Sequence, residues 1–82
     1  MNYMNTEQMI IRKTSIDVVH VHDDEQLWTV VQSYKSYDTV EPCYTLIRED
    51  AFASAPYVES NKSAGYVNEK FGHDVISLFN ED

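Results

Sequence analysis

The chain is poor in cysteine, glycine, proline and long apolar runs, and each shortage excludes a class of protein. With a single cysteine, Cys43, among its 82 residues, it can form neither an internal disulfide nor a zinc site built on several cysteines. Two glycines and two prolines leave no linker, which predicts one domain over residues 1–82 with a loose start at residues 1–6. No apolar run exceeds three residues, whereas a membrane-spanning helix needs about 20.

Basic residues are also scarce, with 6 Lys and Arg against 14 Asp and Glu and a net charge of -8. Each half of the chain carries seven acidic and three basic residues, so the excess is not a disordered acidic tail. In a chain that is 43% hydrophobic, this distribution indicates the surface of a folded domain. Such a surface repels nucleic acid and anionic lipid and attracts cationic partners. Because no signal-like segment opens the chain, we expect a cytoplasmic protein that binds neither nucleic acid nor membrane directly.

Two segments rich in Val, Thr and aromatic residues, 16–22 and 27–34, are separated by a polar cluster at 23–26. This pattern predicts a β-hairpin. A two-residue turn at Asp24 and Glu25 would place four apolar residues on one face, in the cross-strand pairs Val21 with Trp28 and Val19 with Val30. The opposite face would carry Val18, His20, His22, Leu27, Thr29 and Val31. A sheet that is apolar on both sides is usually covered on both, or presents one face to a partner.

The remaining segments give weaker signals. Residues 8–13 are too short to assign by periodicity and could form a short helix or an edge strand. Residues 43–48 predict a third strand, while residues 49–55 have a helix-forming composition that stops at Pro56. Residues 60–65 are predicted to form a loop.

The clearest helix is expected near the C-terminus. Val67, Phe71, Val75 and either Leu78 or Phe79 recur at spacings of three and four, which predicts an apolar stripe about three turns long. The sequence therefore predicts an α+β fold, an antiparallel sheet of three or four strands with a C-terminal helix packed on one face. Its core should include Trp28, Val30, Ile47, Phe71, Val75 and Leu78.

The best candidate for a metal site is the pair His20 and His22. On a strand they would project from the same face about 6.7 Å apart, and two imidazoles at that spacing can share a zinc ion with a following Asp. His73, however, is the only other histidine and lies far away in the sequence. We therefore expect no metal and no cofactor, with both histidines half exposed on the sheet.

No catalytic motif is present. The chain has no Gly-x-Ser-x-Gly turn, no phosphate-binding glycine loop and no pair of carboxylates embedded in an apolar segment. Cys43, between Pro42 and Tyr44, is interpreted as a buried thiol rather than a nucleophile. We expect no catalytic residues and no enzymatic activity.

The six tyrosines and one tryptophan are too many for the core of so small a domain. Tyr and Trp are enriched where proteins meet proteins. Together with the acidic surface, they predict a face that binds a protein partner with a basic surface. The expected partner-binding residues are Asp23, Asp24, Glu25, Tyr34, Tyr37, Asp38, Glu49 and Asp50.

Two stretches carry a resemblance to a known group. Residues 36–40 read Ser-Tyr-Asp-Thr-Val, and residues 63–71 read Ser-Ala-Gly-Tyr-Val-Asn-Glu-Lys-Phe. This pattern resembles short bacteriophage and mobile-element proteins, in which a Ser-Tyr-x-Thr opening leads through a hairpin to a helix. The resemblance implies a hairpin-plus-helix α+β fold and a phage-like origin, hence location in a host cytoplasm. It implies no catalytic residue.

Two functions follow as hypotheses. The first is a small acidic protein-binding module, of the kind that inhibits a nucleic-acid-handling protein by occupying its basic groove, as anti-CRISPR, anti-restriction and glycosylase-inhibiting proteins do. The alternative is an oligomeric protein that binds a small molecule or metal on the His20 and His22 face. That face is either capped by residues 9–11 or buried against a second copy, and we favour the symmetric dimer.

Overall fold

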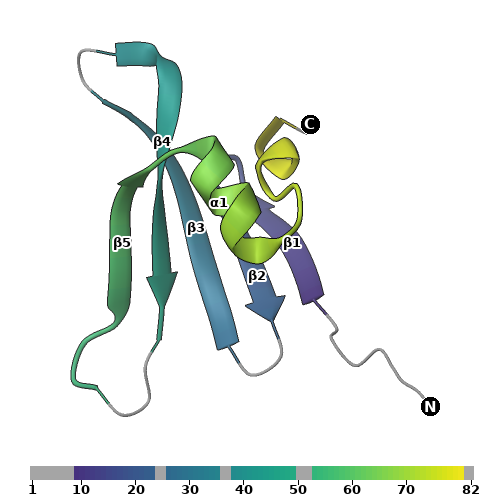
Figure 1. Ribbon diagram of the computed structural model, residues 1–82, viewed down its shortest axis with the longest axis vertical. Coiled ribbons are helices and arrows are strands. Elements are labelled where there is room, and N and C mark those ends of the chain that lie inside the picture. Colours follow the sequence, from purple (N-terminus) through teal and green to yellow (C-terminus); the bar gives the residue numbers. More distant parts are fainter. Residues whose placement is uncertain (1–8, 24–25, 36–37, 50–52, 81–82) are drawn as a thin grey trace.

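Five antiparallel strands form one sheet in chain order, so each strand pairs with the next one along the chain. In this computed structural model, which describes residues 9–23, 26–35, 38–49 and 53–80, the strands are β1 (Met9–Ser15), β2 (Val18–Asp23), β3 (Gln26–Lys35), β4 (Asp38–Arg48) and β5 (Tyr57–Lys62). An α-helix, α1 (Ala64–Phe71), and a 3-10 helix, η1 (Ile76–Asn80), follow the last strand (Figure 1). The predicted α+β class is confirmed, with five strands rather than three or four. The predicted loose start at residues 1–6 lies outside the described residues.

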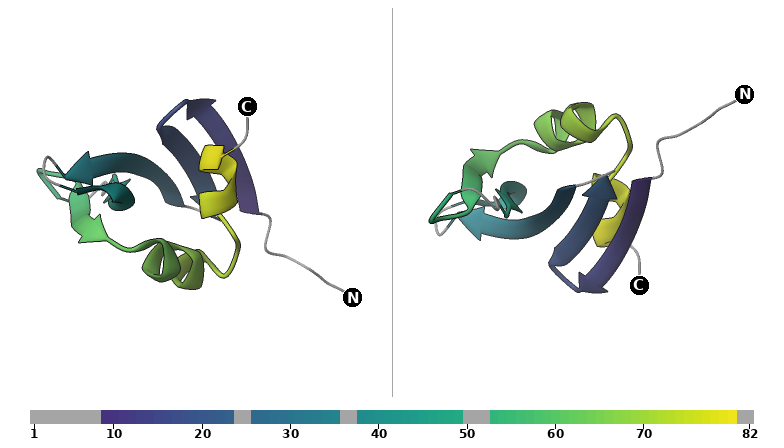
Figure 2. Two further views of the ribbon diagram at one scale, coloured as in Figure 1. Left: turned by 90° about the horizontal axis from the view of Figure 1, so that it is seen from above. Right: turned by 90° about the horizontal axis from the view of Figure 1, so that it is seen from below.

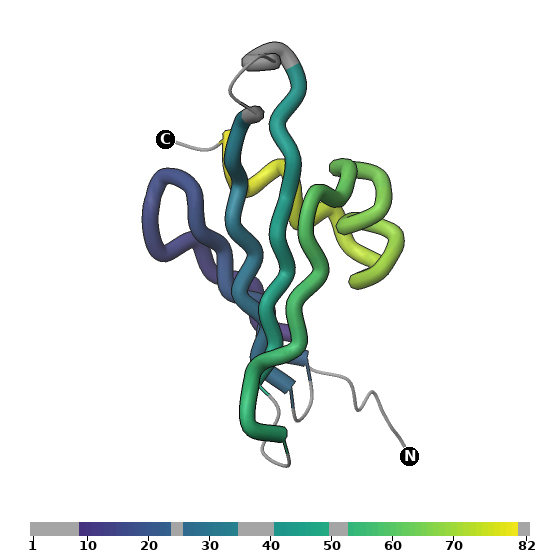
Figure 3. The backbone as a smooth tube through the Cα atoms, turned by 90° about the vertical axis from the view of Figure 1, so that its left-hand side faces the viewer, coloured from purple at the N-terminus to yellow at the C-terminus, as the bar shows by residue number. Residues whose placement is uncertain are grey.

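The β2–β3 hairpin has the predicted register. Val21 lies opposite Trp28, and Val19 lies opposite Val30. The turn residues Asp24 and Glu25 lie outside the described residues, but the pairing on either side of them follows from the period of two in the sequence. Figure 3 shows β3 and β4 running side by side along the length of the molecule.

One face of the sheet is covered by α1 and η1. In Figure 1, α1 crosses the middle of the sheet and η1 lies over β1 and β2, and the two views of Figure 2 show the twist of the sheet beneath them. Alternate residues of the strands meet the helices in one core, made of Val19, Val21, Trp28, Val30, Tyr44, Leu46, Val67, Phe71, Val75 and Phe79. Neither helix in the described part of the chain is long and apolar enough to cross a membrane.

The predicted three-turn helix is wrong in its length. Ser63 caps the start of α1 by accepting a hydrogen bond from the Tyr66 amide at 3.1 Å. Gly72 then adopts a left-handed conformation, with φ of 69°, and its amide donates to the Asn68 carbonyl at 2.8 Å, which ends the helix. Val75 and Phe79 still reach the core, but Val75 does so from the turn after α1 and Phe79 from η1.

Three other segments differ from expectation or resolve an alternative. Residues 8–13 contribute the edge strand β1, which settles the choice left open for them. Residues 60–65, expected to be a loop, supply the end of β5 and the start of α1. Within residues 49–55, the described residues Glu49 and 53–55 are not helical.

The strand β5 escaped detection because its composition is polar and its pairing is irregular. Asn61 has a positive φ of 59°, and the register with β4 shifts between Tyr44 and Leu46, which places a bulge in β5. Asn tolerates this left-handed conformation better than most residues. Strand pairing with β4, rather than local preference, therefore fixes this segment.

Two predicted core positions are only partly buried. Ile47 pairs with Thr29 and Val58 on the face turned away from the helices, so its assignment to the core between sheet and helix is wrong. Successive side chains of a strand point to opposite faces, and Leu46 takes the inward position on β4, so Ile47 points outward. Leu78 packs at the edge of the core, and Cys43 is half-buried rather than fully buried.

Candidate functional site

The face of the sheet that α1 and η1 do not cover carries several exposed apolar side chains. We define this open face as the outward strand positions Ile10, Arg12, Thr14, Val18, His20, His22, Leu27, Thr29, Val31, Ser33, Cys43, Thr45, Ile47 and Val58. The exposed fractions of Ile10, Leu27 and Val58 are 53%, 49% and 48%. The predicted composition of this face in the β2–β3 hairpin is therefore correct, and β1, β4 and β5 extend it.

Residues 9–11 do not cap this face. Ile10 is itself part of the open face, opposite His22, while Met9 and Ile11 point to the core beside η1. The first strand therefore widens the apolar surface instead of covering it. Of the two arrangements expected for this face, internal capping by residues 9–11 is wrong.

The open face contains no Asp or Glu, although the chain has 14 of them. Its charged group is Arg12, which lies directly opposite His20 on β2. His20 in turn lies opposite Thr29, and the Thr29 Oγ1 is 3.3 Å from the His20 Nδ1. An apolar centre depleted in charge is typical of the core of a protein interface.

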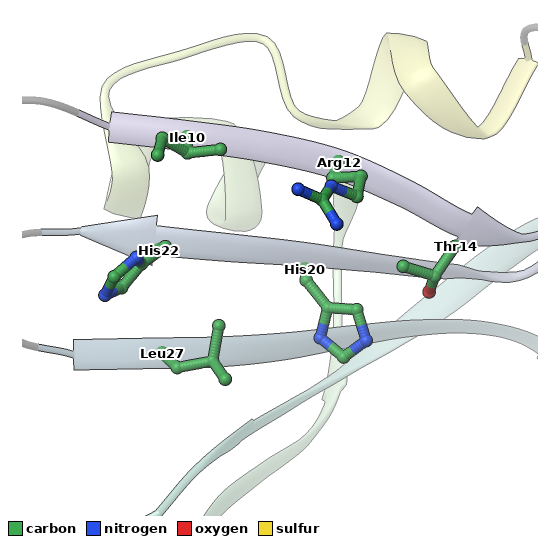
Figure 4. A pocket seen from close by; sticks show the side chains of 6 residues that line it. All are labelled: Ile10, Arg12, Thr14, His20, His22 and Leu27. Atoms are coloured by element: carbon green, nitrogen blue, oxygen red, sulfur yellow. The ribbon is translucent and has the colours of Figure 1, made fainter.

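A shallow hollow of about 310 Å³ occupies the β1–β3 part of the open face (Figure 4). Its lining residues are Ile10, Arg12, Thr14, His20, His22 and Leu27. The hollow brings a guanidinium group and two imidazoles from neighbouring strands together, between two apolar side chains. His20 and His22 therefore share a face as predicted, but no three His, Cys, Asp or Glu residues of the described chain come together to hold a metal ion.

Four of the described carboxylates lie at the ends of the sheet. Asp17, in the β1–β2 turn, and Glu41 lie toward the end where β3 passes into β4. Asp23 and Glu49 lie at the opposite end, where β2 and β4 finish. We call these four residues the acidic ends of the sheet.

The four predicted partner-binding residues that the structure describes do not come together in one cluster. Asp23 and Glu49 come to the same end of the sheet, on strands separated by β3, which corresponds to about 10 Å. Tyr34, which is 53% exposed, and the backbone of Asp38 lie at the other end. The remaining four, Asp24, Glu25, Tyr37 and Asp50, lie outside the described residues.

A second cluster, which the sequence did not reveal, surrounds Glu59 on β5. Glu59 is only 8% exposed, accepts a hydrogen bond from the Tyr66 hydroxyl and lies 3.1 Å from the Lys70 Nζ. The hydrogen bond from Tyr66 and the neighbouring Lys70 hold the pKa of Glu59 below its ordinary value, although burial opposes this. The same hydrogen bond raises the pKa of Tyr66. The cluster ties β5 to α1.

Cations stack on the aromatic rings beside this carboxylate. The Arg48 guanidinium lies 5.3 Å from the Trp28 ring centre and 5.0 Å from that of Tyr57, while the Lys70 Nζ lies 4.8 Å from that of Trp28. Two of the six basic residues are therefore occupied in covering the edge of the core. Glu59 lies just before the segment 60–65 that was expected to be a loop, in a stretch for which no element was predicted, so nothing in the sequence indicated this arrangement.

No family model matches the chain, and comparison with curated proteins and with solved structures finds no match either.

Proposed function

We propose that this chain is a small protein-binding module whose open face docks on a partner protein. The observation that supports this proposal is an apolar sheet face, free of carboxylates in a chain of net charge -8, that α1 and η1 leave uncovered. Ile10, Leu27 and Val58, on β1, β3 and β5, would supply apolar contacts across such an interface. Burial of the face would cost little desolvation of charge, because Arg12 is its one permanently charged residue.

Charge complementarity indicates the kind of partner. The acidic ends of the sheet flank the apolar centre along the strands, so a complementary surface has an apolar patch with Lys and Arg around it. A second copy would instead bring two sets of these carboxylates, and two net charges of -8, against each other. The open face therefore fits a basic partner better than the symmetric dimer expected from the sequence alone.

A more specific proposal is an inhibitor of a nucleic-acid-handling protein. Proteins that grip nucleic acid carry Lys and Arg placed to meet phosphates, and an acidic module can compete for that surface. The grouping of Asp23 and Glu49 at one end of the sheet supports this version, as does the resemblance of residues 36–40 and 63–71 to phage proteins. The partner would then lose nucleic-acid binding as this protein is added, and the competition would weaken as the salt concentration rises.

The docking proposal is tested with a matched pair of variants in partner capture. Leu27→Asp places a carboxylate on the open face, on the middle strand β3, whereas Ile16→Asp makes the same change in the β1–β2 turn, where Ile16 is 81% exposed. Both variants should keep the melting temperature of the wild type within a few degrees. Leu27→Asp should lose a partner that Ile16→Asp retains.

Two results would contradict this assignment. Equal partner retention by both variants would exclude the open face as the interface. A wild-type dimer in sedimentation that Leu27→Asp converts to a 9.5 kDa monomer would show that the occupant is a second copy.

A further inference from the structure

The hollow on the open face has the donors of an anion site, and no carboxylate is among the described residues that line it. Arg12 is exposed on β1, and its cross-strand neighbour is His20 rather than a carboxylate. The salt bridge between Lys70 and Glu59 lies on the other side of the sheet. In a chain with 14 acids and 6 basic residues, Arg12 thus faces a hollow to which none of the described residues contributes a counter-ion.

The histidines lie beside this guanidinium. The His20 Nδ1 is in contact with the Thr29 hydroxyl, so the Nε2 is the ring nitrogen that remains for a ligand. His22, on the same face of β2, lies next to Ile10 and Leu27 in the register. Thr14 contributes less, because its hydroxyl donates to the Val18 carbonyl at 3.4 Å.

The other walls of the hollow are apolar. Ile10 and Leu27 lie on either side of His22 in the sheet and are about half exposed (Figure 4). A simple inorganic anion would leave both side chains in water. A volume of about 310 Å³ is at the small end of the range for ligand sites.

We propose that this hollow binds a small organic monocarboxylate, with its carboxylate on Arg12 and its apolar body between Ile10 and Leu27. An arginine side chain can hold a carboxylate through two parallel hydrogen bonds, and His20 can add a third from Nε2. Arg12 and His20 lie on neighbouring paired strands, so their three donor groups are already held close together before a ligand binds. This site does not depend on a partner protein, and it can be tested on the isolated chain.

Benzoate is a suitable probe, with inorganic phosphate as the comparison. Titration of the isotope-labelled protein with benzoate should shift amide signals of open-face residues in β1, β2 and β3, with a dissociation constant on the order of 1 mM. Phosphate at the same concentrations should bind at least about tenfold more weakly, because it cannot use the apolar walls. Residues of α1 should not shift.

Arg12→Gln should weaken benzoate binding about tenfold or more, since a charged hydrogen-bond pair is lost. Lys13→Gln is the matched control, because it removes the same charge from the next position of β1, on the opposite face, and should leave benzoate binding unchanged. Leu27→Ala, which shortens one apolar wall, should weaken benzoate binding without affecting the weak binding of phosphate. Thermal melting would confirm that each variant is folded.

The proposal is overturned if benzoate causes no shifts, if the shifts lie outside the open face, or if Arg12→Gln binds benzoate like the wild type. Phosphate binding as tight as benzoate binding would overturn the role of the apolar walls. The outcome is separate from that of the docking test, because no partner protein takes part.

Discussion

The hydroxyl of Tyr66 donates a hydrogen bond to Glu59, the one carboxylate that is buried among the described residues. The two residues belong to different elements, Glu59 to β5 and Tyr66 to the first turns of α1. Lys70, one helical turn after Tyr66, contacts the same carboxylate. This arrangement fixes the helix against the last strand of the sheet, where strand pairing alone would leave β5 as an exposed edge.

Replacement of Tyr66 by Phe should therefore destabilise the fold. The variant keeps the ring and removes the hydroxyl, so the buried carboxylate loses a donor while Lys70 remains. We expect the melting temperature to fall by several degrees. Tyr34→Phe, which removes the hydroxyl of a tyrosine that is 53% exposed at the end of β3, should leave the melting temperature almost unchanged. Equal effects of the two variants would show that the Glu59 contact adds no stability.

The lowered pKa of Glu59 predicts how stability depends on pH. Because the carboxyl group binds a proton less readily in the folded state than in the unfolded state, it contributes stability that is fully present above the unfolded-state pKa. That contribution is lost as the pH falls through the folded-state pKa, over roughly pH 5 to pH 3 and below. Denaturation should show Glu59→Gln less stable than the wild type at pH 7, with the difference shrinking toward pH 3. A difference that is constant with pH would contradict this assignment.

The cross-strand pairs of the β2–β3 hairpin could be predicted from the sequence, because the alternation of residues along each strand matches the side that faces the core. Once the turn is placed, the alternate positions Val19, Val21 and Val30 share one face, and the register follows because that face joins the core. The same logic correctly assigned His20 and His22 to the opposite face. The predicted face was wrong for Ile47, which lies on a strand whose register no predicted turn fixed.

The Glu59 cluster could not be predicted, since it depends on contacts between residues whose elements were misread. No element was predicted for residues 57–59 and a loop was predicted from residue 60, but residues 57–62 form β5 by pairing with β4 around the bulge at Asn61. The end of α1 is a related case. Gly72 falls within a regular apolar period, and the period continued beyond it although the helix did not.

The two glycines offer an internally matched test of that helix end. Gly72 has a φ of 69°, which an L side chain adopts only with strain, whereas Gly65 has an ordinary helical conformation, and a Cβ at either position would meet nothing within 4 Å. Gly72→Ala should therefore destabilise the fold by about 1 kcal/mol. Gly65→Ala should stabilise it by about 0.5–1 kcal/mol, because alanine favours the helix and restricts the unfolded chain. Urea denaturation of the two variants would show opposite shifts of the midpoint, and shifts in the same direction would contradict the helix end described above.

Phe71 carries the contact between helix and sheet, so its truncation is the severest test of the fold. The side chain is 7% exposed, and its ring meets Trp28 edge to face, with centres 5.7 Å apart. Phe71→Ala should cost about 3–5 kcal/mol, which is a large part of the stability of a domain this size. Leu27→Ala, at a position that is 49% exposed on the open face, should have a much smaller effect. Circular dichroism should find the Phe71 variant largely unfolded or melting far below the wild type, and a melting temperature within a few degrees of the wild type would show that α1 does not hold the core together.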